Sequence, residues 1–319
     1  MMTVRFVLKR LGFAVILLLT VSFLVFSLQA VSKNSIVSTV LGNRPASPEQ
    51  VAQVRAAYHL DDPFLVRFGL WLRDAVHLDF GTSIRSKEPV MTAIADRLPV
   101  TLELTAIAIV LVVLIGVPFG MIAGIRRGSM ADRIISTLSI FGLSAPVFAT
   151  GIFLLYIFGV FLNWFPSFGG GGPGLVDRLQ HLALPSVALV ATLVAVVSRQ
   201  TRAATLDVMQ QDYVTFARAR GLSPSRVLVR YALRNVSIPI ITVTGLLMIY
   251  LIGGTILVEQ VFSIQGLGQL MVTSVQLSDL PVVQGIAIVI AVFVVVVTLV
   301  VDLAAMVIDP RTMYPSEGR

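Results

Sequence analysis

The 319-residue chain is poor in the residue types that carry out chemistry. It contains no cysteine, which excludes disulfide bridges and thiolate-bound zinc or haem. Its three lysines follow leucine or serine, so the chain has no G-x-x-x-x-G-K-[ST] loop with which to bind ATP by itself. Its three histidines stand apart from one another, without the close pairing of metal ligands. We expect no catalytic site, metal or cofactor in this chain.

Charged residues are also scarce. They make up 13% of the chain, against about 25% in soluble proteins, whereas hydrophobic residues make up 56%. A helix needs about 20 apolar residues to cross the hydrocarbon core of a bilayer. Six runs of about that length are nearly free of charge: Leu11–Val31, Val100–Ile125, Ile134–Leu162, Leu182–Val197, Ile238–Val258 and Val282–Val307. The sequence predicts an all-α polytopic protein with six transmembrane helices, some interrupted by Gly or Pro, as at Gly116 and Pro146.

The basic residues predict the orientation, because Lys and Arg accumulate in short cytoplasmic loops. With the N-terminus inside, 15 of the 24 basic residues fall on the cytoplasmic side. The short loops on the other side hold only Arg178, and the other eight lie in residues 32–98, a loop long enough to be exempt from the rule. We therefore expect both termini in the cytoplasm and the chain in the plasma or inner membrane.

Four regions follow from these spans: 1–31, the cytoplasmic N-terminus and first helix; 32–98, an external loop subdomain; 99–310, the core transmembrane domain; and 311–319, a cytoplasmic tail. Within the external loop, Phe64, Phe68, Trp71 and Leu72 recur at helical spacing and predict an amphipathic helix. That helix is either a structural cap or a surface for an external partner, and the pattern leaves both open.

Ionisable groups inside the spans are rare, because a charge in mid-bilayer costs about 2.5 to 3.5 kcal/mol. Glu259 ends the fifth span on the outer side. It is our candidate for an acid that faces a solute pathway, and a structural role at the end of the helix is the alternative.

The stretch 199–237, between the fourth and fifth spans, is a basic loop with seven arginines and two acids. Its sequence predicts a helix from about Thr205 to Arg220, which ends at Gly221, and a second helix that begins at Pro224. A DNA-binding helix-turn-helix would need a third helix and a core of its own, so we expect no nucleic-acid partner. Binding to lipid headgroups explains the charge without explaining the turn. A docking element for a soluble protein explains both.

The residues Asp212-Tyr-Val-Thr-Phe-Ala-Arg-Ala-Arg-Gly-Leu222 resemble the EAA loop of ABC importer permeases, in the form found in the dipeptide, oligopeptide and nickel permease family. The resemblance extends over nearly the whole chain through further motifs in family order: His59–Phe64, Asp79–Ser83, Arg97–Leu102, Gly142–Pro146, His181–Pro185 and Pro281–Gly285. The chain departs from the general EAA pattern at Thr215–Ala217 and lacks a Pro-Gly-Asp-Pro stretch after the first span.

The resemblance implies a coupling helix that enters a groove on an ATPase. The contact and turn positions carried over from the family are Asp212, Tyr213, Phe216, Ala217, Arg218, Ala219 and Gly221. It also implies a homologous second permease, two ATP-binding-cassette ATPase domains that hold ATP and Mg, and an external substrate-binding protein.

The implied function is import of dipeptides or oligopeptides by alternating access, with hydrolysis on the partner subunits. Import of a nickel chelate or another small solute is the alternative within transport. A membrane-anchored sensor or regulator is the alternative from another class.

Overall fold

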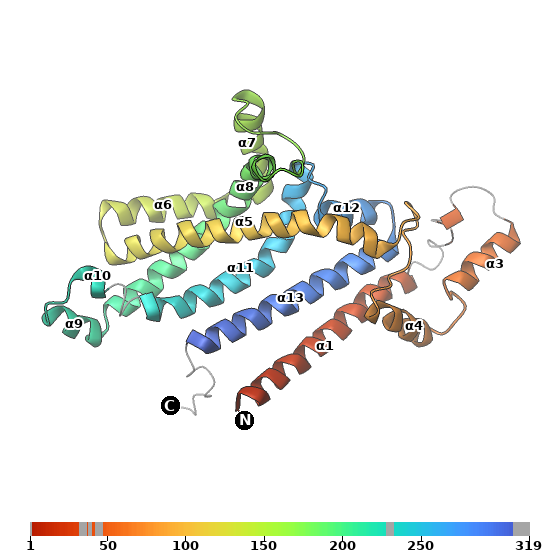
Figure 1. Ribbon diagram of the computed structural model, residues 1–319, viewed down its shortest axis with the longest axis horizontal. Helices are drawn as coiled ribbons and strands as arrows, with labels where there is room; N and C mark the ends of the chain where they lie inside the picture. Colours follow the sequence, from red (N-terminus) through yellow and green to blue (C-terminus); the bar gives the residue numbers. More distant parts are fainter. Residues whose placement is uncertain (1, 32–36, 38–39, 42–46, 228–232, 309–319) are drawn as a thin grey trace. The chain divides into compact units, whose positions relative to one another are not determined.

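The computed structural model describes residues 2–31, 37, 40–41, 47–227 and 233–308 (Figure 1). Within these residues the secondary structure is helical, apart from one isolated β-bridge between Thr82 and Pro89. Five of the helices found there are long and apolar enough to span a membrane, and a bent helix pair gives a sixth span if it is counted as one. The all-α class is confirmed. The chain divides into two compact units, Met1–Pro99 with Gly266–Val296 and Val100–Gln265 with Val297–Arg319, here called the first and the second unit.

The first unit contains the amphipathic helix that the sequence predicts. Its elements are α1 (Met2–Val31), α3 (Pro48–Ala57), α4 (Phe64–Val76), the beginning of α5 (Val90–Ile125), α12 (Leu267–Gln276) and most of α13 (Leu280–Ile308). Phe26 of α1 packs on Phe64, Phe68 and Trp71 of α4, with ring centroids 5.4 to 5.6 Å apart. The apolar face of α4 is therefore covered by α1.

A buried carboxylate holds the loop before α5 against the beginning of α13. Asp279, 3% exposed, accepts hydrogen bonds from the Ser83 hydroxyl (2.5 Å) and from the backbone N–H groups of Ile84 (3.1 Å) and Arg85 (3.3 Å). These three donors satisfy a group that would be costly to bury alone. The sequence by itself assigns Asp279 no role.

The second unit is built around α8 (Leu175–Met209), which is the most buried of the five long spans. Its other helices are the remainder of α5, α6 (Met130–Ser144), α7 (Val147–Leu154), the π-helix η1 (Leu155–Phe161), α9 (Asp212–Ala219), α10 (Pro224–Val227), α11 (Arg234–Val261) and the end of α13. The predicted span Leu182–Val197 is too short. The helix continues because its polar residues Ser198, Thr201 and Thr205 are buried against α5.

Glycines on α5 make that burial possible. Gly116, Gly120 and Gly124 recur every four residues, and a Cβ atom on Gly120 would lie 2.5 Å from the carbonyl oxygen of Ser198. The Ser198 hydroxyl donates to the carbonyl of Gly116 (3.1 Å). Small residues at this spacing let two membrane helices approach until their backbones touch. Gly116 does not interrupt α5, which continues past it as one helix. Its role is to let α5 pack closely on α8.

The third predicted span, Ile134–Leu162, is not one straight helix. The chain leaves helix α6 at Ala145, where the backbone is extended, and α7 begins after Pro146 at an angle of 101° to α6. The residue before a proline avoids the helical conformation, so Ala145–Pro146 is where the break is expected. Figure 1 shows α7 turning away from α6.

Candidate functional site

The predicted coupling element is a short helical hairpin beyond the end of α8, formed by α9 and α10 (Figure 1). Val214 and Ala217 of α9 and Val227 of α10 are buried together, and Val208, Met209 and Leu222 pack against them. This small core fixes α9 to the end of α8.

A left-handed glycine closes the turn between the two helices. Gly221 has φ +75°, a conformation that residues with a Cβ atom adopt only at a cost. Its N–H donates to the carbonyl of Arg218 (2.9 Å), and the Leu222 N–H donates to that of Ala217 (3.3 Å). The predicted turn at Gly221 and the helix start at Pro224 are both confirmed.

The predicted single helix from Thr205 to Arg220 is wrong. It is broken between Met209 and Asp212, because Gln211 has an extended backbone (φ −72°, ψ 145°). Asp212 then begins α9, where its carboxylate lies at the positive end of the helix. The break separates the hairpin from the long helix. The predicted loop 199–237 accordingly begins inside α8.

The residues carried over from the family occupy different sides of α9. Ala217 is buried in the hairpin core, whereas Asp212, Tyr213, Phe216, Arg218 and Ala219 are exposed. Phe216 is 69% exposed and Tyr213 is 39% exposed. Two aromatic side chains three positions apart on one short helix form an apolar face for a partner surface.

A hydrogen bond joins the hairpin to α11. The side-chain amide of Asn235, in the first turn of α11, donates to the Tyr213 hydroxyl (3.0 Å). The coupling element is therefore connected to α8 through its apolar core and to α11 through this hydrogen bond. Arg226 of α10 is exposed, and Arg230 lies outside the described residues.

One arginine of the basic loop has a structural partner. Arg202 of α8 binds the carboxylate of Asp132 with two hydrogen bonds, of 2.6 Å from Nε and 2.9 Å from one terminal nitrogen. Asp132, which is 5% exposed, also accepts from the Gly128 N–H (2.9 Å), and its own N–H donates to the N-cap Ser129. This ion pair joins the beginning of α6 to α8 near the hairpin. The sequence offers no local signal for it, because the partners are 70 residues apart.

Glu259, the candidate pathway acid, is completely buried. The Thr101 hydroxyl of α5 donates to its carboxylate (2.7 Å), and the Ile264 N–H donates to its backbone carbonyl (2.9 Å). Glu103, further along α5, forms an ion pair with Arg178 of α8. Polar groups therefore connect α5 to α8 and α11 at this end of the second unit. A pathway role for Glu259 stays a prediction.

Comparison with known protein families identifies the family of the chain. The profile of the binding-protein-dependent transport system inner membrane component matches residues 116–314, and the profile of the N-terminal region of such membrane components matches residues 2–105. The chain belongs to this family. It is thus a multi-pass permease component of a binding-protein-dependent importer, as the resemblance implies.

Curated relatives match the permease over almost its full length. A putative peptide transport system permease protein of Brucella melitensis is 37% identical over 98% of this chain and 100% of its own. A probable peptide ABC transporter permease of Sinorhizobium fredii is 35% identical over 97% and 99%. The glutathione transport system permease protein GsiC of Shigella flexneri is 38% identical over 97% and 99%.

Solved structures agree on the fold of the permease. A chain of the MetNI methionine ABC transporter, in an inward-facing conformation, matches with a TM-score of 0.59 and 18% identity. The match covers 70% of this chain and 99% of that one. At this identity the likeness shows the fold alone.

Proposed function

We propose that this permease is one of two membrane subunits of an ATP-driven importer for short peptides. The names of its full-length relatives, two peptide permeases and a glutathione permease, support the substrate class, since glutathione is itself a tripeptide. They do not favour import of a nickel chelate, and family membership disfavours a sensor or regulator.

We propose that the ATPases act on the permease through α9. Its exposed aromatic residues, Phe216 and Tyr213, are the observation that carries this step. An aromatic ring that is 69% exposed on a short, well-anchored helix is stabilised when a partner covers it. We propose that each of two ATPase domains receives such a helix from one permease, and that ATP and Mg bind on those domains. The hairpin would then face the cytoplasm, the side on which the basic residues also predict the two chain termini.

The connections of α9 determine what its movement displaces. The Tyr213–Asn235 hydrogen bond leads to α11, the hairpin core leads to α8, and the Asp132–Arg202 pair extends from α8 to α6. Movement of α9 therefore moves three helices of the second unit as one body. In the proposed cycle, ATP-driven closure of the ATPases turns this body, together with that of the homologous permease, from outside-open to inside-open.

Glu259 has a place in this cycle. Its carboxylate is buried beside Thr101 at the end of α11. We propose that it faces the pathway in one of the two states and binds the ammonium group of a passing peptide.

Uptake into proteoliposomes tests the proposal. The complex of both permeases and the ATPases is reconstituted with its binding protein outside and ATP inside, and a radiolabelled dipeptide is supplied. ATP-dependent accumulation is expected, and an ATPase variant that binds but does not hydrolyse ATP serves as the control. Accumulation of a nickel chelate in place of dipeptide or glutathione would contradict the substrate class. A chain that purifies without ATPase and binds DNA would contradict transport itself.

A further inference from the structure

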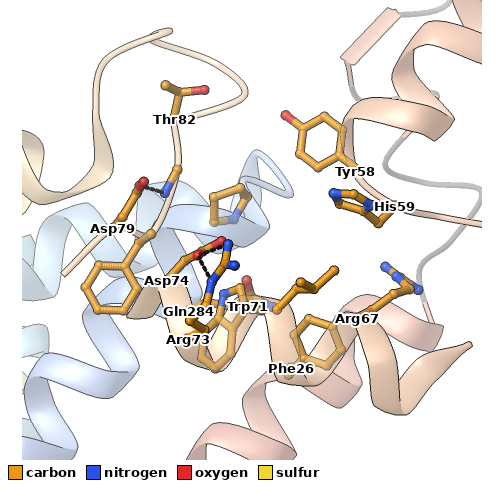
Figure 2. A pocket seen from close by; sticks show the side chains of 14 residues that line it. Phe26, Tyr58, His59, Arg67, Trp71, Arg73, Asp74, Asp79, Thr82 and Gln284 are labelled. Atoms are coloured by element: carbon orange, nitrogen blue, oxygen red, sulfur yellow. Dashed lines mark hydrogen bonds and ion pairs between the residues drawn. The ribbon is translucent and has the colours of Figure 1, made fainter. Parts of the chain in front are cut away.

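The first unit contains a pocket of about 600 Å³ that the transport cycle above does not use. Its walls come from α1, α4, the residues that follow α3, the loop before α5 and the beginning of α13, all within that unit. The volume is in the range of sites that hold small molecules. Figure 2 shows the side chains that line it.

An unpaired cation lines this pocket. Arg67 is only 3% exposed, and none of its three guanidinium nitrogens has a hydrogen-bond partner among the residues that the structure describes. One face of the guanidinium lies on the Phe26 ring, 5.8 Å from its centroid. Burial lowers the pKa of Arg67, and the charge of Asp62 opposes that shift only in part. A buried guanidinium is stabilised by an oxyanion that accepts from its N–H groups.

Among the described residues, no carboxylate accepts a hydrogen bond from Arg67. The segment between α1 and α3, residues 32–46, contains neither Asp nor Glu. The carboxylate of Asp62 accepts from His59 (3.1 Å), and that of Asp74 accepts from Arg73 (3.0 Å). The missing acceptor of Arg67 is therefore expected to come from a ligand.

A second buried donor and the acid Asp79 define the rest of the ligand. The Gln284 side-chain nitrogen is buried and also has no partner in the described part of the chain. Figure 2 shows Asp79, and Asp74 with its ion-pair partner Arg73, on the side of the pocket away from Arg67. Trp71 and Phe80 supply apolar wall. The pocket therefore has a cationic side, a donor for a carbonyl, an acidic side and room for an apolar side chain.

We propose that this pocket binds a short zwitterionic peptide on the permease itself. Arg67 pairs with the terminal carboxylate, Gln284 donates to a peptide carbonyl, and the acidic side faces the terminal ammonium group. The proposal rests on the proposed peptide specificity, and adds a site in this chain where peptide is held. A phosphatidylethanolamine headgroup offers a phosphate to Arg67 and an ammonium group to Asp79, but it carries two acyl chains and has no carbonyl between those charges to accept from Gln284.

Peptide binding to the full chain in nanodiscs tests the proposal by isothermal titration calorimetry. The probes are alanyl-phenylalanine, its C-terminal amide and its N-acetyl derivative. The free dipeptide is expected to bind at least tenfold more tightly than the amide. Arg67→Met should remove that difference by weakening only the free dipeptide. Arg55→Met is the matched control, because Arg55 is an exposed arginine of the same unit outside the pocket, and binding should be unchanged.

Folding is followed in each variant by its melting temperature. Arg67→Met removes an unpaired buried charge, so the melting temperature should not fall. A lower melting temperature with unchanged dipeptide affinity would overturn the proposal, because Arg67 would then be a structural residue. Binding of glycerophosphoethanolamine but not of dipeptide would assign the pocket to lipid and would overturn the proposal as well. If the importer accumulates dipeptide but the chain does not bind it, this inference fails and the proposed function stands. If the chain binds dipeptide through Arg67 but the importer accumulates none, peptide transport fails and the pocket stands.

Discussion

Replacement of Gly221 isolates the turn that positions the coupling helix. Gly221 has φ +75°, and a Cβ atom built there meets no heavy atom within 4 Å. The penalty for a side chain is therefore conformational and not steric. It amounts to about 1 to 2 kcal/mol for an ordinary residue, more for a β-branched one and less for asparagine, which tolerates this region. A penalty of 1.4 kcal/mol shifts the equilibrium away from the closed turn by about tenfold.

A graded series follows from that magnitude. Uptake coupled to ATP hydrolysis should fall in the order Gly221→Asn, Gly221→Ala, Gly221→Val, while all three variants still insert into the membrane. The assay is the ratio of dipeptide accumulated to ATP hydrolysed in proteoliposomes. Gly253→Ala is the matched control, because Gly253 also has open space around it but no left-handed backbone, so the alanine should be neutral or slightly stabilising. Equal coupling in the Val and Asn variants would refute the reasoning.

Three further predictions test the contacts between the helices of the second unit. Gly120→Val should lower the melting temperature by the equivalent of about 1 to 3 kcal/mol, since even the first added carbon meets the Ser198 backbone. An unchanged melting curve would contradict the close packing of α5 on α8. Arg202→Met should destabilise the detergent-solubilised chain by on the order of 3 kcal/mol, because it leaves buried Asp132 without its cation. In a double-mutant cycle, the combination of Arg202→Met with Asp132→Asn should recover much of that loss. Tyr213→Phe removes a hydrogen bond worth about 0.5 to 1.5 kcal/mol, so transport per ATP should fall while binding of the ATPase persists. A ratio of transport to ATP hydrolysis equal to that of the wild type would exclude a role for the Tyr213–Asn235 hydrogen bond in coupling.

The features that the sequence predicts well are those with a local physical cause. Long apolar runs define the spans, Gly221 defines the left-handed turn, and Pro224 begins the next helix. The apolar face of α4 is read from side chains at helical spacing, and α1 covers it. Each of these depends on residues close together in the chain.

The features that the sequence does not reveal depend on partners far apart in the chain. Asp132 and Arg202, Asp279 and Ser83, and Thr101 and Glu259 are brought together only by the fold. The extent of α8 was mispredicted for the same reason, since its polar residues look like a cytoplasmic loop until α5 covers them. The unpaired state of Arg67 is likewise invisible in the sequence, where Asp62 stands five residues away.

Crosslinking at Phe216 tests the central claim that α9 receives the movement of an ATPase. The chain has no cysteine, so Phe216→Cys creates a single reactive site, and Leu65→Cys on the exposed side of α4 is the control. In the assembled complex, both variants are labelled with a maleimide that carries a photoreactive benzophenone, which inserts into C–H bonds of any neighbouring chain when it is irradiated. The account predicts a covalent adduct with the ATPase from position 216 and none from position 65, with a yield that changes when ATP is added. No adduct from position 216 in a complex that still transports would contradict it.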